Sequence, residues 1–157
     1  MISQRLRRYR ALTLTEILAA AAILTVVVLA TTKCRYHSTL DAKRANMQMT
    51  AARMGLTFCE SWRGIKGAET YDPSVHLGSE LTLTAGAGPA EPADFTLLGT
   101  YSVVSDGETY YVTLSWKDVK TGLRALNVIV AWTQQVKTVI TLDDADKLFE
   151  LTTYTLN

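Results

Sequence analysis

The sequence has few residues that interrupt a helix over its first 63 positions. All three prolines fall between residues 73 and 92, and Gly55 is the only glycine before Gly64. Proline lacks a backbone donor and glycine adds conformational freedom, so a segment without them has no local reason to leave the helix. We therefore predict one continuous helix over residues 12–63, ended by Gly64 or Gly67.

The sequence is also poor in the residues on which most enzyme and metal sites depend. Its two histidines, His37 and His76, have no cysteine or histidine at metal-ligand spacing. There is no glycine-rich phosphate loop or nucleophile elbow. Asp143, Asp144 and Asp146 lack the EF-hand pattern, which favours a solvated turn over a calcium site. We expect no enzyme activity, no metal and no cofactor.

Only two cysteines occur, Cys34 and Cys59, and both lie on the predicted helix. Twenty-five residues of helix separate them by about 37 Å, whereas a disulfide needs Cα atoms within about 7 Å. We predict that they do not pair within one chain. The simplest interpretation is that they pack as small apolar residues, although Cys34 could also contact another chain.

Basic and acidic residues are nearly balanced, at 16 and 15, which predicts no strong attraction to nucleic acid. Four arginines at residues 5–10 precede an apolar run at residues 12–32. A helix over that run extends about 31 Å, close to the ~30 Å hydrocarbon core of a bilayer. The arginines predict a cytoplasmic N-terminus and export of everything after Thr32.

Glu16 is the single charged residue within the apolar run. A carboxylate in a membrane segment is costly, although less so near its edge. Thr13 and Glu16 match the S/T-x-x-E capping box, in which the carboxylate bonds back to the Thr13 amide at the positive end of the helix. Capping is one explanation of Glu16, and a contact with another molecule is a second that can coexist with it.

Two fates of the N-terminus fit these patterns. An ordinary secretory signal could be cleaved after Ala30, leaving Thr31 first, or the segment could remain as an uncleaved anchor. The acid inside the apolar run and the helical pattern beyond Ala30 stand against ordinary signal cleavage.

Residues 33–63 continue the helix with an apolar stripe at helical spacing, which indicates a packing face. The stripe comprises Leu40, Met47, Ala51, Met54, Phe58 and Trp62. Residues 65–98 then contain every proline and several glycines, which predicts a long surface connection with a short strand at Glu80–Thr84. This connection is either a contact surface for partners or a tolerated insertion.

The C-terminal part predicts an antiparallel sheet. Asp106 and Gly107 form a two-residue hairpin signal, and the flanking segments alternate apolar and polar residues. The predicted strands are Leu97–Val104, Tyr110–Trp116, Leu123–Thr133 and Leu148–Leu156, with Val136–Leu142 as a further candidate. One face is expected to cover the helix stripe and the other to meet solvent. Trp116 and Trp132 are interpreted as packing residues.

The segment Arg8-Tyr-Arg-Ala11, followed by Leu12-Thr-Leu-Thr-Glu16-Ile-Leu, resembles the class III signal of type IV pilins and pseudopilins. The family usually has glycine and phenylalanine where this sequence has Ala11 and Leu12. The resemblance implies cleavage between Ala11 and Leu12 by a prepilin peptidase, N-methylation of Leu12 and a role for Glu16 in assembly. More loosely, the C-terminal strands are similar to those of minor pilins of the PilV type and of type II secretion pseudopilins.

Cleavage there creates an α-amine that is positively charged near neutral pH. Glu16 could pair with the Leu12 ammonium of a neighbouring subunit, where an unpaired carboxylate would be unfavourable in a low-dielectric core. Charge neutralisation would then set the register between subunits. Without residues 1–11, twelve basic residues remain against fifteen acidic ones.

The sequence thus predicts an α+β, pilin-like fold with a leader (1–11), a transmembrane or filament-core helix (12–32), an amphipathic continuation (33–63) and a globular part (64–157). The expected function is a structural subunit of a type IV pilus-like or type II secretion filament. Its expected partners are other subunits, the prepilin peptidase and the bacterial inner membrane, with the globular part in the periplasm or on a surface filament. The alternative is a single-pass or secreted binding domain that enters no filament.

Overall fold

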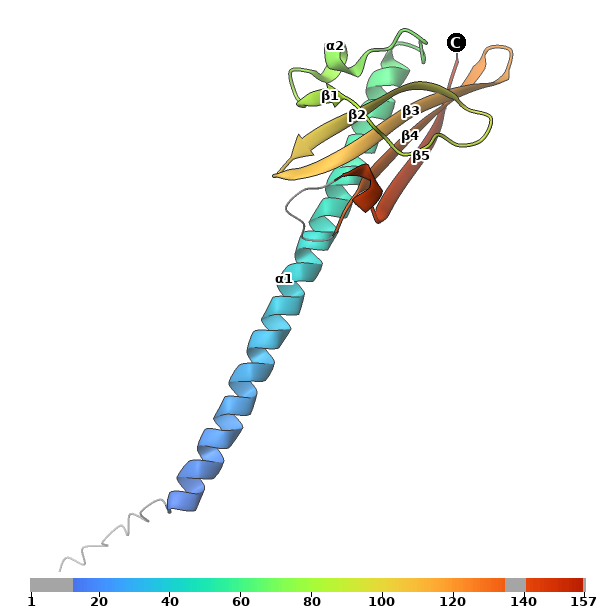
Figure 1. The fold of residues 1–157 in the computed structure, drawn as a ribbon. Coiled ribbons are helices and arrows are strands. Elements are labelled where there is room, and N and C mark those ends of the chain that lie inside the picture. Colours follow the sequence, from blue (N-terminus) through green and yellow to red (C-terminus); the bar gives the residue numbers. More distant parts are fainter. Residues whose placement is uncertain (1–12, 135–140, 157) are drawn as a thin grey trace, which may run out of the picture. The chain divides into compact units, whose positions relative to one another are not determined.

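The computed structural model describes residues 13–134 and 141–156, which form one long helix packed on a five-stranded antiparallel sheet (Figure 1). This α+β architecture is the one predicted. The helices are α1 (Leu14–Gly64) and α2 (Pro73–Leu77), and Leu142–Asp144 forms a 3-10 turn. The strands are β1 (Leu83–Ala85), β2 (Thr96–Ser105), β3 (Glu108–Lys120), β4 (Leu123–Trp132) and β5 (Lys147–Thr155). The chain divides into two compact units, the first ending at Lys43 and the second beginning at Arg44.

Helix α1 ends where the sequence predicted. The Lys66 N–H donates to the Arg63 carbonyl at 2.9 Å, and the Gly67 N–H donates to the Trp62 carbonyl at 3.0 Å. Lys66 and Gly67 both have positive φ, at 58° and 67°. This pair of bonds satisfies carbonyl groups that the end of a helix otherwise leaves without donors.

The predicted apolar stripe of α1 forms half of the core of the second unit. Met47, Ala51, Met54, Phe58 and Trp62 are all buried. At Gly55 the helix comes so close to β5 that an added Cβ would lie 2.9 Å from the Phe149 ring. From Met47 onward the stripe is the packing face that its spacing indicated, whereas Leu40, which was predicted with it, is half-buried and outside the core.

The other half of the core comes from the alternating residues of the sheet. On β3 these are Tyr110, Val112 and Leu114, and on β4 they are Leu126, Val128, Val130 and Trp132. Both sets lie on the face predicted from period-2 alternation. Trp132 is buried and Trp116 packs against the core, as expected for packing residues.

The strands pair in chain order, β1-β2-β3-β4-β5, and every pairing is antiparallel. Asp106 and Gly107 make the predicted two-residue turn between β2 and β3, with φ of 54° and 77°. Two successive positive φ values are the signature of a turn whose twist matches that of its strands. The β3–β4 turn is as tight, because Lys120 pairs with Leu123.

Two expectations for the connection after α1 were wrong in detail. The short strand is Leu83–Ala85 and not Glu80–Thr84, and Pro73–Leu77 forms a helix that the sequence did not predict. Asp72 caps this helix by accepting a 2.8 Å hydrogen bond from the Ser74 N–H. An Asp-Pro pair is a good helix start, but five residues are too few to show helical periodicity.

The expectation that the second face of the sheet meets solvent was also wrong at its centre. Thr113, Ser115 and Asn127 are fully buried there. The segment after β1 crosses this face (Figure 1), and the Thr113 hydroxyl donates to the Pro89 carbonyl at 2.6 Å. The central strands are therefore covered on both sides. The predicted extension at Val136–Leu142 lies largely outside the described residues, and Leu142 belongs to the 3-10 turn.

Candidate functional site

The first unit contains the apolar part of α1. Residues 14–32 are long and apolar enough to cross a membrane, and every side chain in them is exposed. Exposed apolar side chains around a whole helix are unfavourable in water and favourable in lipid or between other helices. The segment is therefore suited to a membrane, as its composition predicted.

Thr25, Thr31 and Thr32, three of the threonines in the apolar run, have hydroxyls that are satisfied within the helix. Thr25 donates to the Ala21 carbonyl and Thr32 to the Val28 carbonyl, both at 2.8 Å. Thr31 donates in the same way to the carbonyl of Val27. A hydroxyl bonded four residues back presents mainly its methyl group, so these residues do not oppose burial in an apolar medium.

Glu16 occupies the first turn of α1 and forms the predicted capping box. Its Oε2 accepts from the Thr13 N–H at 2.8 Å and from the Thr13 hydroxyl at 2.9 Å. The Glu16 N–H in turn points to the Thr13 hydroxyl oxygen at 3.4 Å. Ala11 and Leu12, the predicted processing residues, lie outside the described residues.

The side of α1 that faces away from the sheet carries a short apolar row. Ala45, Met49, Ala52 and Leu56 follow one another at intervals of four, three and four residues, which places them on one side of the helix. Met49 and Leu56 are 52% and 48% exposed. This row has the spacing of a helix–helix contact and is not used by the sheet.

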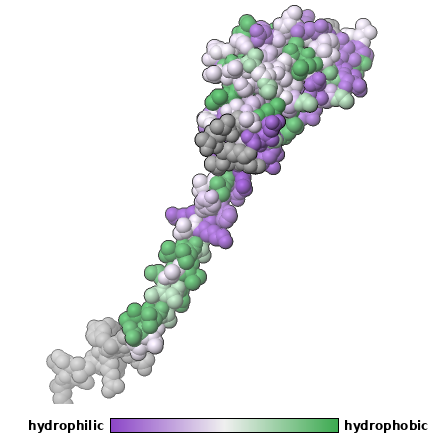
Figure 2. All heavy atoms as spheres, in the orientation of Figure 1, coloured by the Kyte–Doolittle hydropathy of each residue, from purple (hydrophilic) through white to green (hydrophobic). Residues whose placement is uncertain are grey.

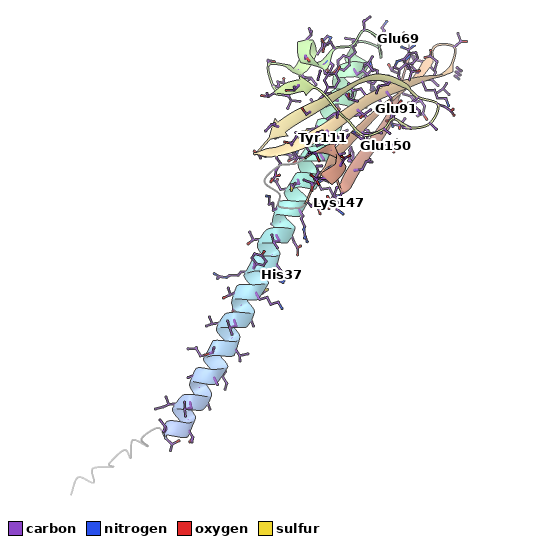
Figure 3. All side chains as sticks on the ribbon, in the orientation of Figure 1. His37, Glu69, Glu91, Tyr111, Lys147 and Glu150 are labelled. Atoms are coloured by element: carbon purple, nitrogen blue, oxygen red, sulfur yellow. The ribbon has the colours of Figure 1, made fainter. Side chains whose placement is uncertain are left out.

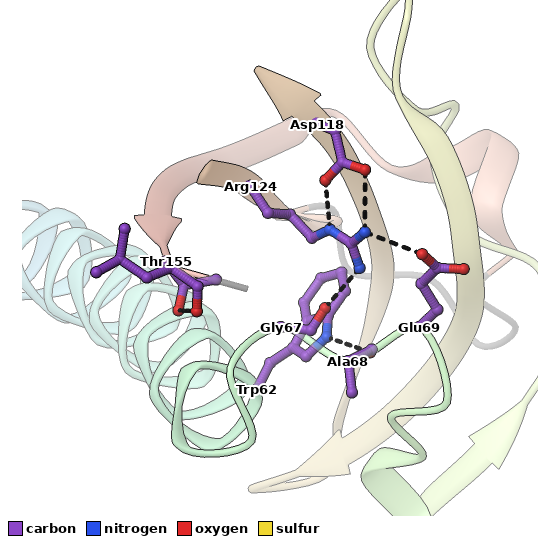
Figure 4. A network of polar contacts seen from close by, with 8 residues as sticks. Trp62, Gly67, Ala68, Glu69, Asp118, Arg124 and Thr155 are labelled. Atoms are coloured by element: carbon purple, nitrogen blue, oxygen red, sulfur yellow. Dashed lines mark hydrogen bonds and ion pairs between the residues drawn. The ribbon is translucent and has the colours of Figure 1, made fainter. Parts of the chain in front are cut away.

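A polar cluster that the sequence analysis did not identify joins the end of α1 to the sheet (Figure 4). The Arg124 guanidinium donates to both carboxylate oxygens of Asp118, at 2.7 and 3.1 Å. It also bonds Glu69 at 2.9 Å and the Gly67 carbonyl at 3.0 Å. Its Cζ lies 3.8 Å from the centre of the Trp116 ring. The only sequence signal was an acid and a base on either side of the 121–122 turn.

The two cysteines are free, as predicted, but they differ in setting. Cys34 is exposed and Cys59 is buried. Burial raises the pKa of the Cys59 thiol to about 11. Cys59 therefore behaves as the small apolar residue that was expected, while Cys34 remains accessible.

No cluster among the described residues has the composition of a metal site, because no group of three or more His, Cys, Asp or Glu residues comes together there. Asp144 caps the 3-10 turn by accepting from the Thr141 N–H, and Asp146 accepts from the Gln134 N–H at 2.9 Å. A shallow hollow of about 310 Å³ lies on the second sheet face, lined by Pro89, Ala131 and residues of the 142–148 segment. It contains no convergent set of polar groups.

The chain matches no protein-family model, no curated protein and no solved structure.

Proposed function

We propose that the protein is a structural subunit, minor pilin or pseudopilin in type, of a type IV pilus-like or type II secretion filament. One observation carries the proposal: an apolar helix with a single acid in its first turn continues into an amphipathic half that is packed on an antiparallel sheet. The signal-like segment around Ala11, Leu12 and Glu16 supports the same assignment. The function is mechanical, with no enzyme chemistry.

Within this proposal the first unit serves twice. Before assembly it holds the chain in the inner membrane, N-terminus in the cytoplasm, and prepilin peptidase cuts between Ala11 and Leu12. After assembly it packs among the same helices of other subunits, with Glu16 facing a Leu12 ammonium. The row Ala45, Met49, Ala52 and Leu56 extends the apolar contact surface beyond the membrane part of α1.

Mass spectrometry of the N-terminus of the native protein tests the processing step. The proposal requires a chain that begins with methylated Leu12. A chain that begins at Thr31 would establish ordinary secretion, and an intact Met1 would establish an uncleaved anchor.

The role of Glu16 is separable from capping by a single substitution. Glutamine at this position still fits the capping box but has no charge. We expect both Glu16→Gln and Glu16→Ala to abolish incorporation into filaments, with the second unit still folded. Thr13→Val is the matched control, because it removes the capping hydroxyl and leaves the carboxylate. Normal incorporation of Glu16→Gln would contradict charge pairing.

The alternative is a membrane-anchored or secreted binding domain that enters no filament. The 65–95 connection favours it, because this segment crosses one sheet face near Pro89 and most of its residues are partly or fully exposed. Such a protein would tolerate Glu16→Gln without loss of localisation or partner binding.

A further inference from the structure

A band of cationic and aromatic side chains surrounds α1 immediately after its apolar run. It comprises Lys33, Arg35, Tyr36 and His37, which are all exposed, and we call it the collar. The Tyr36 and His37 rings meet edge to face, with centroids 5.8 Å apart. In Figure 2 a hydrophilic band follows the apolar segment along α1, and Figure 3 shows His37 projecting outward from the helix.

The collar's charges lie around the helix and not along one side of it. Successive helical residues are 100° apart, so Lys33 and Arg35 project in nearly opposite directions. Neither has an acidic residue three or four positions away, the spacing of an intrahelical ion pair. The first acid after Glu16 is Asp41, eight residues beyond Lys33. The collar therefore presents positive charge on two opposite sides of α1 at one level.

The position of the collar matches the thickness of a bilayer. Residues 14–32 extend about 28 Å along the helix, against a hydrocarbon core of about 30 Å. Side chains that follow directly lie at the depth of the phospholipid head groups. Lysine, arginine and tyrosine are the residues that occupy this depth in membrane proteins, because each combines an apolar stem or ring with a polar end.

We propose that the collar binds the phosphate groups of anionic phospholipids in the leaflet where the apolar run ends, and so fixes the depth at which α1 leaves the bilayer. Charge complementarity supports a lipid, because guanidinium and ammonium groups bind phosphate oxygens strongly. The placement of charge on opposite sides favours lipids over an acidic protein segment, since a protein contacts one side of a helix whereas lipids surround it. The inference needs only the membrane span and holds whether or not the chain enters a filament.

Cys34 provides the means to test this proposal, because it lies between Lys33 and Arg35 and is exposed. A maleimide fluorophore at pH 7 labels Cys34 and not the buried Cys59, whose thiol pKa is about 11. The labelled full chain is placed in phosphatidylcholine vesicles that contain a small fraction of nitroxide lipid, either phosphatidylglycerol or phosphatidylcholine. Nitroxide quenching is short-ranged, so it reports the lipids beside Cys34 and not those beside the arginines that precede the span.

We expect nitroxide phosphatidylglycerol to associate with the labelled site roughly fivefold more strongly than nitroxide phosphatidylcholine. The ratio of the two associations, phosphatidylglycerol over phosphatidylcholine, should fall to about one in the double variant Lys33→Gln/Arg35→Gln. The matched control is Arg53→Gln/Arg63→Gln, which removes two exposed positive charges from the second unit and should keep the ratio. Equal quenching by both lipids in the unmodified chain, or a ratio that survives in Lys33→Gln/Arg35→Gln, would overturn the proposal. So would an equal loss in the control.

Discussion

Arg124 is the residue on which the polar contacts of the second unit converge. Its side chain is 7% exposed, and its guanidinium makes four hydrogen bonds, to two carboxylates and the Gly67 carbonyl. Asp118 and Glu69 keep about half of their surface in water, so they bear less of the cost of burial than Arg124 does. The cluster ties the segment after α1 to the β3–β4 hairpin.

We expect Arg124→Met to lower the free energy of unfolding by roughly 2 kcal/mol, because the Gly67 carbonyl loses its donor and both carboxylates lose a charged partner. Arg124→Lys should lose much of the same stability, since one ammonium cannot replace a planar fork that binds two carboxylates and stacks on Trp116. Chemical denaturation of the three proteins measures this. A fully stable Arg124→Lys would show that charge alone matters.

The same cluster makes stability depend on pH in a defined direction. The hydrogen bonds from Arg124 hold the pKa of Asp118 below its usual value. A carboxyl whose pKa is lowered by folding contributes stability above its unfolded pKa, and the contribution disappears as pH falls through the folded pKa. The melting temperature of Asp118→Asn should therefore lie below that of the unmodified chain at pH 7. The two should converge below about pH 4, and a constant gap would contradict the assignment.

At the scale of elements, the hairpins and the helix stripe could be predicted because their information is local. Asp106 and Gly107 define the β2–β3 turn by their tolerance of positive φ, and period-2 alternation places Val112 and Leu114 on the core face. The packing face of α1 could be predicted in the same way, because the helical spacing of its apolar residues is enough to define it.

The covering of the second sheet face could not be predicted, because it depends on contacts between distant residues. Thr113, Ser115 and Asn127 are polar and so resemble solvent-facing residues. Buried, they bond to one another and to segments far away in sequence: Asn127 donates to the Glu150 carboxylate at 2.7 Å and to the Thr152 hydroxyl at 2.9 Å. Arg124 was missed for the same reason, since Glu69 lies 55 residues earlier in the chain.

Gly107 and Gly64 give a matched test of the β2–β3 turn. A Cβ at either position would meet no atom within 4 Å, but only Gly107 has a positive φ, at 77°. We expect Gly107→Ala to reduce the free energy of unfolding by about 1 kcal/mol through backbone strain. Gly64→Ala should leave it unchanged or raise it slightly. Thermal unfolding followed by circular dichroism distinguishes them, and equal effects would rule out strain at the turn.

At the scale of the whole molecule, the two units have different requirements. The first exposes apolar side chains along residues 14–32, and these depend on lipid or on other helices for burial. The second contains the apolar core of the described residues, from Met47 to Trp132 with the partly buried residues of β5. Within residues 13–134 and 141–156, no part of that core comes from positions before Arg44.

We therefore expect the fragment of residues 44–157 to fold in water without detergent. Its melting temperature should be close to that of the second unit in the full chain in detergent micelles, because the same core is buried in both. Scanning calorimetry and gel filtration provide the measurement, with Phe58→Ala as a destabilised control. A fragment that is unfolded or aggregated would show that the apolar part of α1 is needed for folding.

The chain-order pairing of the strands also has a consequence for biosynthesis. The ribosome makes the α1 stripe first, and the residues of β4 that cover it, such as Leu126 and Val128, are made more than 60 positions after Trp62. Because synthesis proceeds at about 5–20 residues per second, the stripe stays exposed for several seconds before β4 has been made. Each hairpin can close as soon as its second strand exists, so the sheet itself adds little delay. A nascent chain arrested between residues 62 and 120 is the form most prone to bind chaperones or to aggregate.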